Sequence, residues 1–304
     1  MGAERALTRR LASFFGSGPG VRIGIGDDAA VVDARGEQIV LCCDPVVQGV
    51  HFLASAPLSL VGKKAVNRNL SDLAAMGATP DWLLVSLLLP RALTAAKLQA
   101  LLRGIRAAAR AGGARVIGGD VANTPGPLVV TVTACGHLDT ERAMTRAGAR
   151  PGDTIHVSGP LGGSEAGHHL RFCPELAVGR WLVRQPQVHA AIDVSDGLLL
   201  DLDTLLRESG APGAEIDIER LPLRPAARRL AGGDLNKARQ RALGDGEDYV
   251  LLWTQAAGPL ARGGPLPLRA RQPIGRVVER RGLWLVDGAG RRRVQPLGYQ
   301  HRSG

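Results

Sequence analysis

The sequence predicts an α+β protein built from two layered α/β domains. The chain has 304 residues, of which 45% are apolar, and this is enough to form two cores. In both halves, apolar runs that are typical of strands alternate with stretches of helical periodicity. Over residues 146–153 the composition turns to Arg, Gly and Pro, which is typical of a domain edge. We therefore predict an N-terminal domain over residues 1–145 and a C-terminal domain over residues 146–304.

The first half contains two predicted helices among its strands. One helix is predicted over residues 57–76, because the apolar pattern ends there at Gly77 and Pro80. The other is predicted over residues 92–111, which are rich in Ala and Leu and are followed by Gly112. Strands are predicted over residues 21–25, 29–32, 39–43, 82–89, 115–117 and 128–136.

The second half repeats this alternation less regularly. A helix is predicted from Gly163 onward, and another where Leu198, Leu202 and Leu205 recur at helical spacing. Strands are predicted over residues 154–158, 190–194 and 249–253. The second domain is therefore expected to have the same kind of layered α/β structure as the first.

Composition excludes several classes of protein. No run approaches the roughly 18 apolar residues that a membrane-spanning helix needs. The net charge of +10 comes mainly from Arg spread along the chain, without the interleaved aromatic residues that stack on bases. The four cysteines show no C-x-x-C spacing and predict neither a disulfide framework nor a zinc site. We expect a cytoplasmic protein whose partners include neither nucleic acid nor a membrane.

Acidic residues are scarce, 28 against 38 basic ones, yet they recur beside Gly or Ser or directly after predicted strands. A single Asp at such a position is more often a helix or turn cap. Several carboxylates gathered together would repel one another unless a hard cation lay between them, and Mg²⁺ accepts such oxygen ligands together with substrate phosphates. The pattern therefore predicts a site for magnesium and phosphate. Its segments are Gly26-Asp27-Asp28, Asp44, Ser71-Asp72, Gly118-Gly119-Asp120, Asp193-Val194-Ser195-Asp196-Gly197 and Gly246-Glu247-Asp248.

Two of these segments carry additional information. Asp72 lies inside the apolar run 69–76, where an ionised carboxylate without a partner would be costly; a surface position for Asp72 is the alternative. Gly118 and Gly119 provide a backbone without Cβ atoms, which lets phosphate oxygens approach amide groups closely. Taken alone, the glycine pair is a weak indication of a phosphate site.

Other nucleotide-binding patterns do not fit the chain. Gly24, Gly26 and Ala29 match G-x-G-x-x-A, with Asp44 near the position of a Rossmann acidic residue. However, the adjacent carboxylates of Asp27 and Asp28 would repel a pyrophosphate, and the run that follows is typical of a strand. The P-loop motif and the motifs of protein kinases are absent from the sequence.

Taken together, these segments resemble the thiamine-monophosphate kinase family, within the aminoimidazole ribonucleotide synthetase superfamily. The resemblance spans nearly the whole chain, and its motifs are specific in combination. They are Gly24 to Ala29, Asp44 with Gly49-Val50-His51-Phe52, Asn69 to Ala78, Gly118-Gly119-Asp120, Thr145-Arg146 before Pro151-Gly152-Asp153, Ile192 to Leu198, and Gly246-Glu247-Asp248-Tyr249.

The resemblance implies a homodimer in which the N-terminal domains pair their mixed sheets, and an active site that binds ATP and several Mg²⁺ ions. The implied metal ligands are Asp28, Cys43, Asp44, Asp72, Asp120, Asp193 and Asp196, of which Asp28, Asp72, Asp120 and Asp193 are also the implied catalytic residues. The implied nucleotide contacts are Gly119, Asp120, Arg146 and Ser195. The implied contacts to thiamine monophosphate are His51, Glu247 and Tyr299.

The chain departs from the family pattern at two places. Cys42 and Cys43 stand where the family commonly has Ser or Thr, and because a thiol is a poor magnesium ligand, Cys43 is expected to contribute its backbone carbonyl. Pro296 stands where the family often has a Trp beside the thiamine ring, so Tyr299 is expected to stack on the ring instead.

The implied reaction is direct in-line transfer of the γ-phosphoryl group of ATP to thiamine monophosphate, which gives thiamine diphosphate. The acceptor is a phosphate with a second pKa of about 6, so no general base is required at neutral pH. The alternatives are another ATP-using enzyme of the superfamily, acting on a purine precursor or on selenide, and a basic nucleic-acid-binding protein. No Cys precedes Cys42, which argues against selenide as the substrate.

Overall fold

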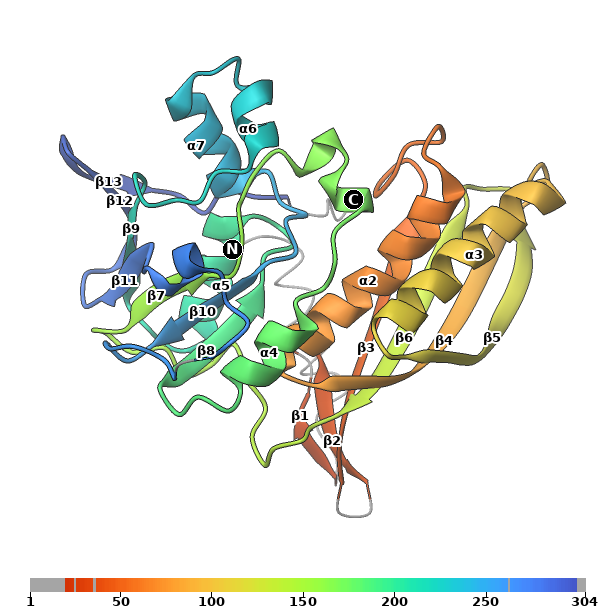
Figure 1. Cartoon of the computed structure of the whole chain (residues 1–304), viewed down its shortest axis with the longest axis horizontal. Helices are drawn as coiled ribbons and strands as arrows, with labels where there is room; N and C mark the ends of the chain where they lie inside the picture. Colours follow the sequence, from red (N-terminus) through yellow and green to blue (C-terminus); the bar gives the residue numbers. More distant parts are fainter. Residues whose placement is uncertain (1–19, 25, 35–36, 262, 300–304) are drawn as a thin grey trace.

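The computed structural model describes residues 20–24, 26–34, 37–261 and 263–299, and it contains two mixed β-sheets (Figure 1). The first sheet has the strand order β1-β2-β3-β6-β4-β5. Strands β4 and β5 run parallel, whereas the other neighbours are antiparallel. Its strands are β1 (Val21–Ile23), β2 (Ala30–Ala34), β3 (Glu37–Val47), β4 (Thr79–Pro90), β5 (Arg115–Thr124) and β6 (Val129–His137).

Two long helices, α2 (Leu58–Met76) and α3 (Ala95–Ala111), cover one face of this sheet (Figure 1). The sequence determines their ends: Thr94 accepts a hydrogen bond from the Lys97 amide at the start of α3, and Gly77 adopts the left-handed conformation, with φ of 77°, after α2. Both predicted helices are therefore confirmed, with α3 starting three residues later than expected.

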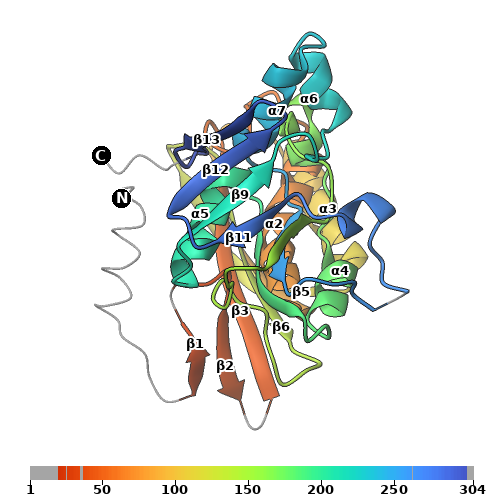
Figure 2. The ribbon, with the colours of Figure 1, turned by 90° about the vertical axis from the view of Figure 1, so that its left-hand side faces the viewer.

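The second sheet has the order β13-β12-β9-β11-β7-β10-β8, with helices packed around it (Figure 2). Its strands are β7 (Thr154–Val157), β8 (Val188–Asp193), β9 (Gly213–Asp217), β10 (Leu251–Gln255), β11 (Gly275–Val278), β12 (Gly282–Asp287) and β13 (Gly290–Val294). The helices of this half are α4 (Leu176–Leu182), α5 (Leu198–Glu208), α6 (Pro225–Leu230) and α7 (Leu235–Gly244), with the 3₁₀ turns η1 (Ser164–Ala166), η2 (His168–Leu170) and η3 (Leu268–Arg271).

Helix α2 lies between the two sheets and belongs to a core that includes both. Its buried face packs in one cluster with Leu182 of α4 and Trp253 of β10. Helix α4 approaches it so closely that a Cβ atom on Gly179 would lie 2.0 Å from the Ala74 carbonyl oxygen. A polar residue on α2 can therefore reach groups from either sheet.

The mixed α/β architecture confirms the predicted fold class, but two local predictions were wrong. No long helix begins at Gly163 in the described chain; the segment forms the short turns η1 and η2, because Gly162, Gly163 and Gly167 all adopt positive φ angles. Gly118, Gly119 and Asp120 lie inside β5 and not after its end. In the described ranges, no helix is long and apolar enough to cross a membrane.

Candidate active site

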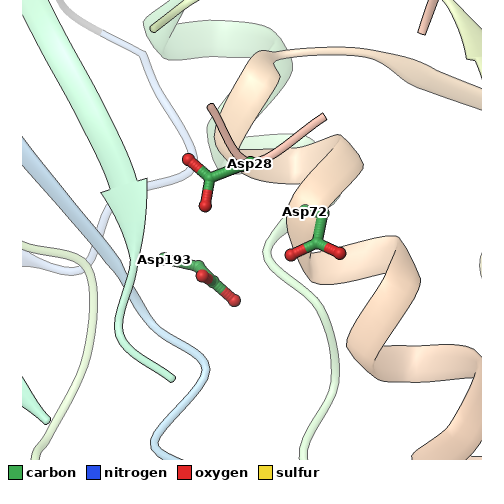
Figure 3. Close-up of side chains that lie close together, drawn as sticks. All are labelled: Asp28, Asp72 and Asp193. Atoms are coloured by element: carbon green, nitrogen blue, oxygen red, sulfur yellow. The ribbon is translucent and has the colours of Figure 1, made fainter. Parts of the chain in front are cut away.

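Three carboxylates from separate segments meet beside α2 (Figure 3). Asp28 follows β1, Asp72 lies on α2, and Asp193 is the last residue of β8. Each offers an oxygen atom, and these oxygens lie within 4.8 Å of one another. The structure therefore brings together three of the predicted metal ligands, from both sheets and from the helix between them.

The electrostatics of this cluster favour a bound cation. Burial, and then the charge of Asp28, raise the pKa of Asp193 to about 7, although the Ser71 hydroxyl donates a hydrogen bond of 2.6 Å to its carboxylate. Burial, and then the charges of Asp44, Asp193 and Asp28, raise the pKa of Asp72 well above its ordinary value. A divalent cation bound by oxygen ligands would relieve this repulsion, so the donor set fits Mg²⁺.

Two arginines provide positive charge at the edge of the cluster. Arg146 forms a two-pronged ion pair with Asp28, from Nε to Oδ2 at 3.1 Å and from Nη2 to Oδ1 at 2.8 Å. Arg68 on α2 pairs with Asp44 at 3.1 Å. Guanidinium groups are suited to binding polyphosphate. Groups suited to phosphate therefore lie directly beside carboxylates suited to a metal ion.

A cavity of about 120 Å³ lies next to these groups and contains all three predicted substrate residues. The Nδ1 atom of His51 accepts the Val47 amide at 3.0 Å, so the neutral ring carries its proton on Nε2. The cavity lining comprises Val50, His51, Arg68, Ser195, Asp196, Asp245, Gly246, Glu247, Tyr249 and Tyr299. The predicted nucleotide contact Ser195 and the predicted metal ligand Asp196 thus share this cavity with the substrate residues.

Asp120 does not join the cluster within a single chain. It aligns with Ser86 of β4, and Ser86 aligns with Thr131 of β6. Thr131 in turn aligns with Pro45 of β3, the neighbour of Asp44. Three strand spacings of about 4.8 Å separate Asp120 from β3, or about 14 Å in total.

Two other predicted residues have local structural roles. Gly119 is required by packing, because a Cβ atom there would lie 1.8 Å from the Val85 carbonyl oxygen. The exposed thiol of Cys43 accepts a hydrogen bond from the Thr133 hydroxyl at 3.2 Å. Because side chains alternate along a strand, the thiol of Cys43 points away from the face that carries Asp44. The nucleotide role of Gly119 and the carbonyl role of Cys43 stay predictions.

Sequence reasoning missed Lys64, Arg68 and His169. Arg68 lines the same cavity, and Lys64 and His169 both contact its lining residue Glu247. The sequence does contain a signal for Lys64 and Arg68. Lys64, Arg68 and Asp72 are spaced four residues apart on α2, so they form one stripe on the helix. A prediction that placed Asp72 in a site could therefore have included the two cationic residues that precede it on the same face.

Comparison with known proteins identifies relatives over the whole chain. Residues 26–138 match the family model for AIR synthase related protein, N-terminal domain. The thiamine-monophosphate kinase of Rhodopirellula baltica is 39% identical and covers 98% of this chain and 94% of its own length. The thiamine-monophosphate kinase of Aquifex aeolicus is 35% identical over 91% of this chain and 92% of its own length.

Solved structures agree with these relatives. A structure of AaThiL complexed with AMPPCP and TMP matches with a TM-score of 0.85 and 31% identity, and covers 98% of this chain and 97% of its own. E. coli HypE, a hydrogenase maturation protein, matches with a TM-score of 0.68 and 21% identity over 98% of this chain and 99% of its own. Because HypE is only 21% identical, its likeness to this chain concerns the fold alone.

The raised pKa of Asp193 predicts how stability depends on pH in a chelator. The folded state holds this proton up to pH about 7, whereas the unfolded state loses it near 3.8. The contribution of Asp193 to stability is therefore full below pH about 4 and is lost as the pH rises through about 7. Urea denaturation at pH 5, 6, 7 and 8 should show a smaller fall in the free energy of unfolding for Asp193→Asn than for wild type, and equal falls would contradict the electrostatic account.

Proposed function

The chain belongs to the thiamine-monophosphate kinase family, and we propose that it transfers the γ-phosphoryl group of ATP to thiamine monophosphate, forming thiamine diphosphate. The observation that carries this proposal is the joint position of the carboxylate cluster and the cavity. Asp28, Asp72 and Asp193 lie together, and Arg68 and Ser195, in the adjoining cavity, line the space that also contains His51 and Glu247. This arrangement supports a metal–phosphate site that would adjoin a site for an organic substrate.

We propose that Asp28, Asp72 and Asp193 hold Mg²⁺, with Asp44 and Asp196 as further ligands. When bound, Mg²⁺ would offset the charge of the phosphate oxygens. Arg146 and Ser195 would contact the nucleotide. Because Arg146 is paired with Asp28 at 2.8 Å, its guanidinium already lies beside the proposed metal site. The protein's contribution is then mainly the positioning of two anionic reactants and the neutralisation of their charge.

The acceptor requires no general base in this proposal. A phosphate monoester with a second pKa of about 6 is largely a dianion at neutral pH and is itself the nucleophile. His51 fits a binding role, because its Nδ1 atom is already used as an acceptor by the Val47 amide. We infer that the transfer is direct and that His51 orients the substrate.

We also propose that the site is completed by a second copy of the chain. In the described residues, β5 pairs only with β4, and the part of β3 after Leu41 pairs only with β6. Pairing β5 of one copy with β3 of the other would satisfy both edges and would bring Asp120 to the partner's Asp44. Apolar side chains exposed on this sheet fit the same interface: Trp82, Leu84, Leu88, Val116, Ile117 and Val121.

Replacement of Asp72 by Asn tests the proposed function. The shape is nearly unchanged, so the fold should be kept, but one anionic ligand is lost and kcat should fall about 100-fold or more. Chromatographic measurement of thiamine diphosphate formed from ATP, Mg²⁺ and thiamine monophosphate provides the readout. Asp33→Asn, an exposed change on β2, is the control and should be active. A wild-type protein without this activity would refute the proposal, and a folded, fully active Asp72→Asn variant would remove Asp72 from the metal site.

Mixing two inactive variants tests the shared site. If Asp120 acts on the partner's site, an Asp120→Asn chain and an Asp193→Asn chain form a mixed dimer with one intact site. Random pairing of equal amounts should then restore about a quarter of wild-type activity, since about half of the dimers are mixed. Each variant measured alone is the control. No recovery after verified exchange of subunits would show that Asp120 acts within its own chain or not at all.

A further inference from the structure

Lys64 on α2 is a fully buried cation that contacts two residues of the proposed substrate cavity, His51 and Glu247. Its side chain has 0% exposure. Its Nζ atom donates to the His51 carbonyl oxygen at 2.6 Å and to the Glu247 carboxylate, and it lies 3.1 Å from Nδ1 of His169. These three partners match the three donors of an ammonium group. Burial lowers the pKa of Lys64, and the charge of Glu247 opposes this shift.

The three partners come from segments that are far apart in the chain. His51 follows β3 of the first sheet, whereas His169 and Glu247 belong to the half of the chain that forms the second sheet. The ammonium group of Lys64 therefore links the two proposed substrate contacts, His51 and Glu247, which both line the cavity. An ion pair in such a buried place is costly to break, because the remaining charge is left without a partner.

The segment that carries Glu247 needs such support. Glu247 and Tyr249 have φ angles of 53° and 50°, a strained conformation that non-glycine residues rarely adopt. Tyr249 is held by stacking on Phe172, with ring centroids 3.9 Å apart. Glu247 is held by Lys64 and, at 3.4 Å, by His169.

We propose that Lys64 is a positioning residue for thiamine monophosphate: its ammonium group fixes the distance between the His51 loop and the Glu247 carboxylate. The inference rests on the proposed function. Lys64 has no contact with Asp28 or Asp193 among the described hydrogen bonds and ion pairs, so it should affect the binding of the organic acceptor and leave ATP binding nearly unchanged.

The test is steady-state kinetics of Lys64→Gln with each substrate varied in turn. A glutamine cannot neutralise Glu247 or satisfy all three partners, so the KM for thiamine monophosphate should rise about 10- to 100-fold, while the KM for ATP should stay within about twofold. Lys63→Gln is the matched control, because it makes the same change one residue earlier on α2 at a partly exposed position. Its kinetic constants should equal those of wild type.

A second variant keeps the proposal testable if Lys64→Gln does not fold. If Lys64→Gln does not melt cooperatively, Lys64→Arg keeps the charge but distributes it over a planar group, and it should show the same selective rise in KM. A folded variant with an unchanged KM for thiamine monophosphate, or with equal rises for both substrates, would overturn the inference. Absence of turnover in wild type and Lys63→Gln would instead refute the proposed function, so the two failures are distinguishable.

Discussion

The repulsion among Asp28, Asp72 and Asp193 is the constraint on which the rest of the site depends. Folding places three carboxylates within 4.8 Å of one another, and burial leaves little water to screen their charges. Two of them have raised pKa values as a result. A fold that keeps such a cluster needs compensation. Arg146 and Arg68 oppose the negative charge, and the proposed metal ion would do the same.

Helix α2 organises this compensation because it lies between the sheets and is buried on most sides. Its stripe of Lys64, Arg68 and Asp72 passes from the substrate cavity to the carboxylate cluster. One end of the stripe holds Glu247, and the other end supplies a proposed metal ligand. The acceptor and the phosphoryl donor would thus be positioned by a single rigid element, which is the arrangement that in-line transfer between two anions requires.

The sequence predicted the elements whose signals are local. The helix that ends at Gly77 and the carboxylate of Asp193 at the end of β8 could be recognised because caps and strand ends have characteristic residues. Asp44 and Asp120 were expected after strands but lie inside β3 and β5. The short turns after Gly163 were missed because helical spacing does not reveal three glycines with positive φ angles. The role of Lys64 could not be derived from the sequence, since its partners His51, His169 and Glu247 are up to 183 residues away. Likewise, no local pattern indicates that Asp120 lies three strand spacings from β3, the strand that carries Asp44, in its own chain.

The central claim is that Asp28, Asp72 and Asp193 form a divalent-metal site that binds the nucleotide phosphates. Anomalous diffraction from crystals grown with Mn²⁺ and a non-hydrolysable ATP analogue tests it most directly, because Mn²⁺ accepts the same oxygen ligands as Mg²⁺. The account predicts an anomalous peak in contact with all three carboxylates and with phosphate oxygens. Well-ordered nucleotide with no peak among these carboxylates would contradict it.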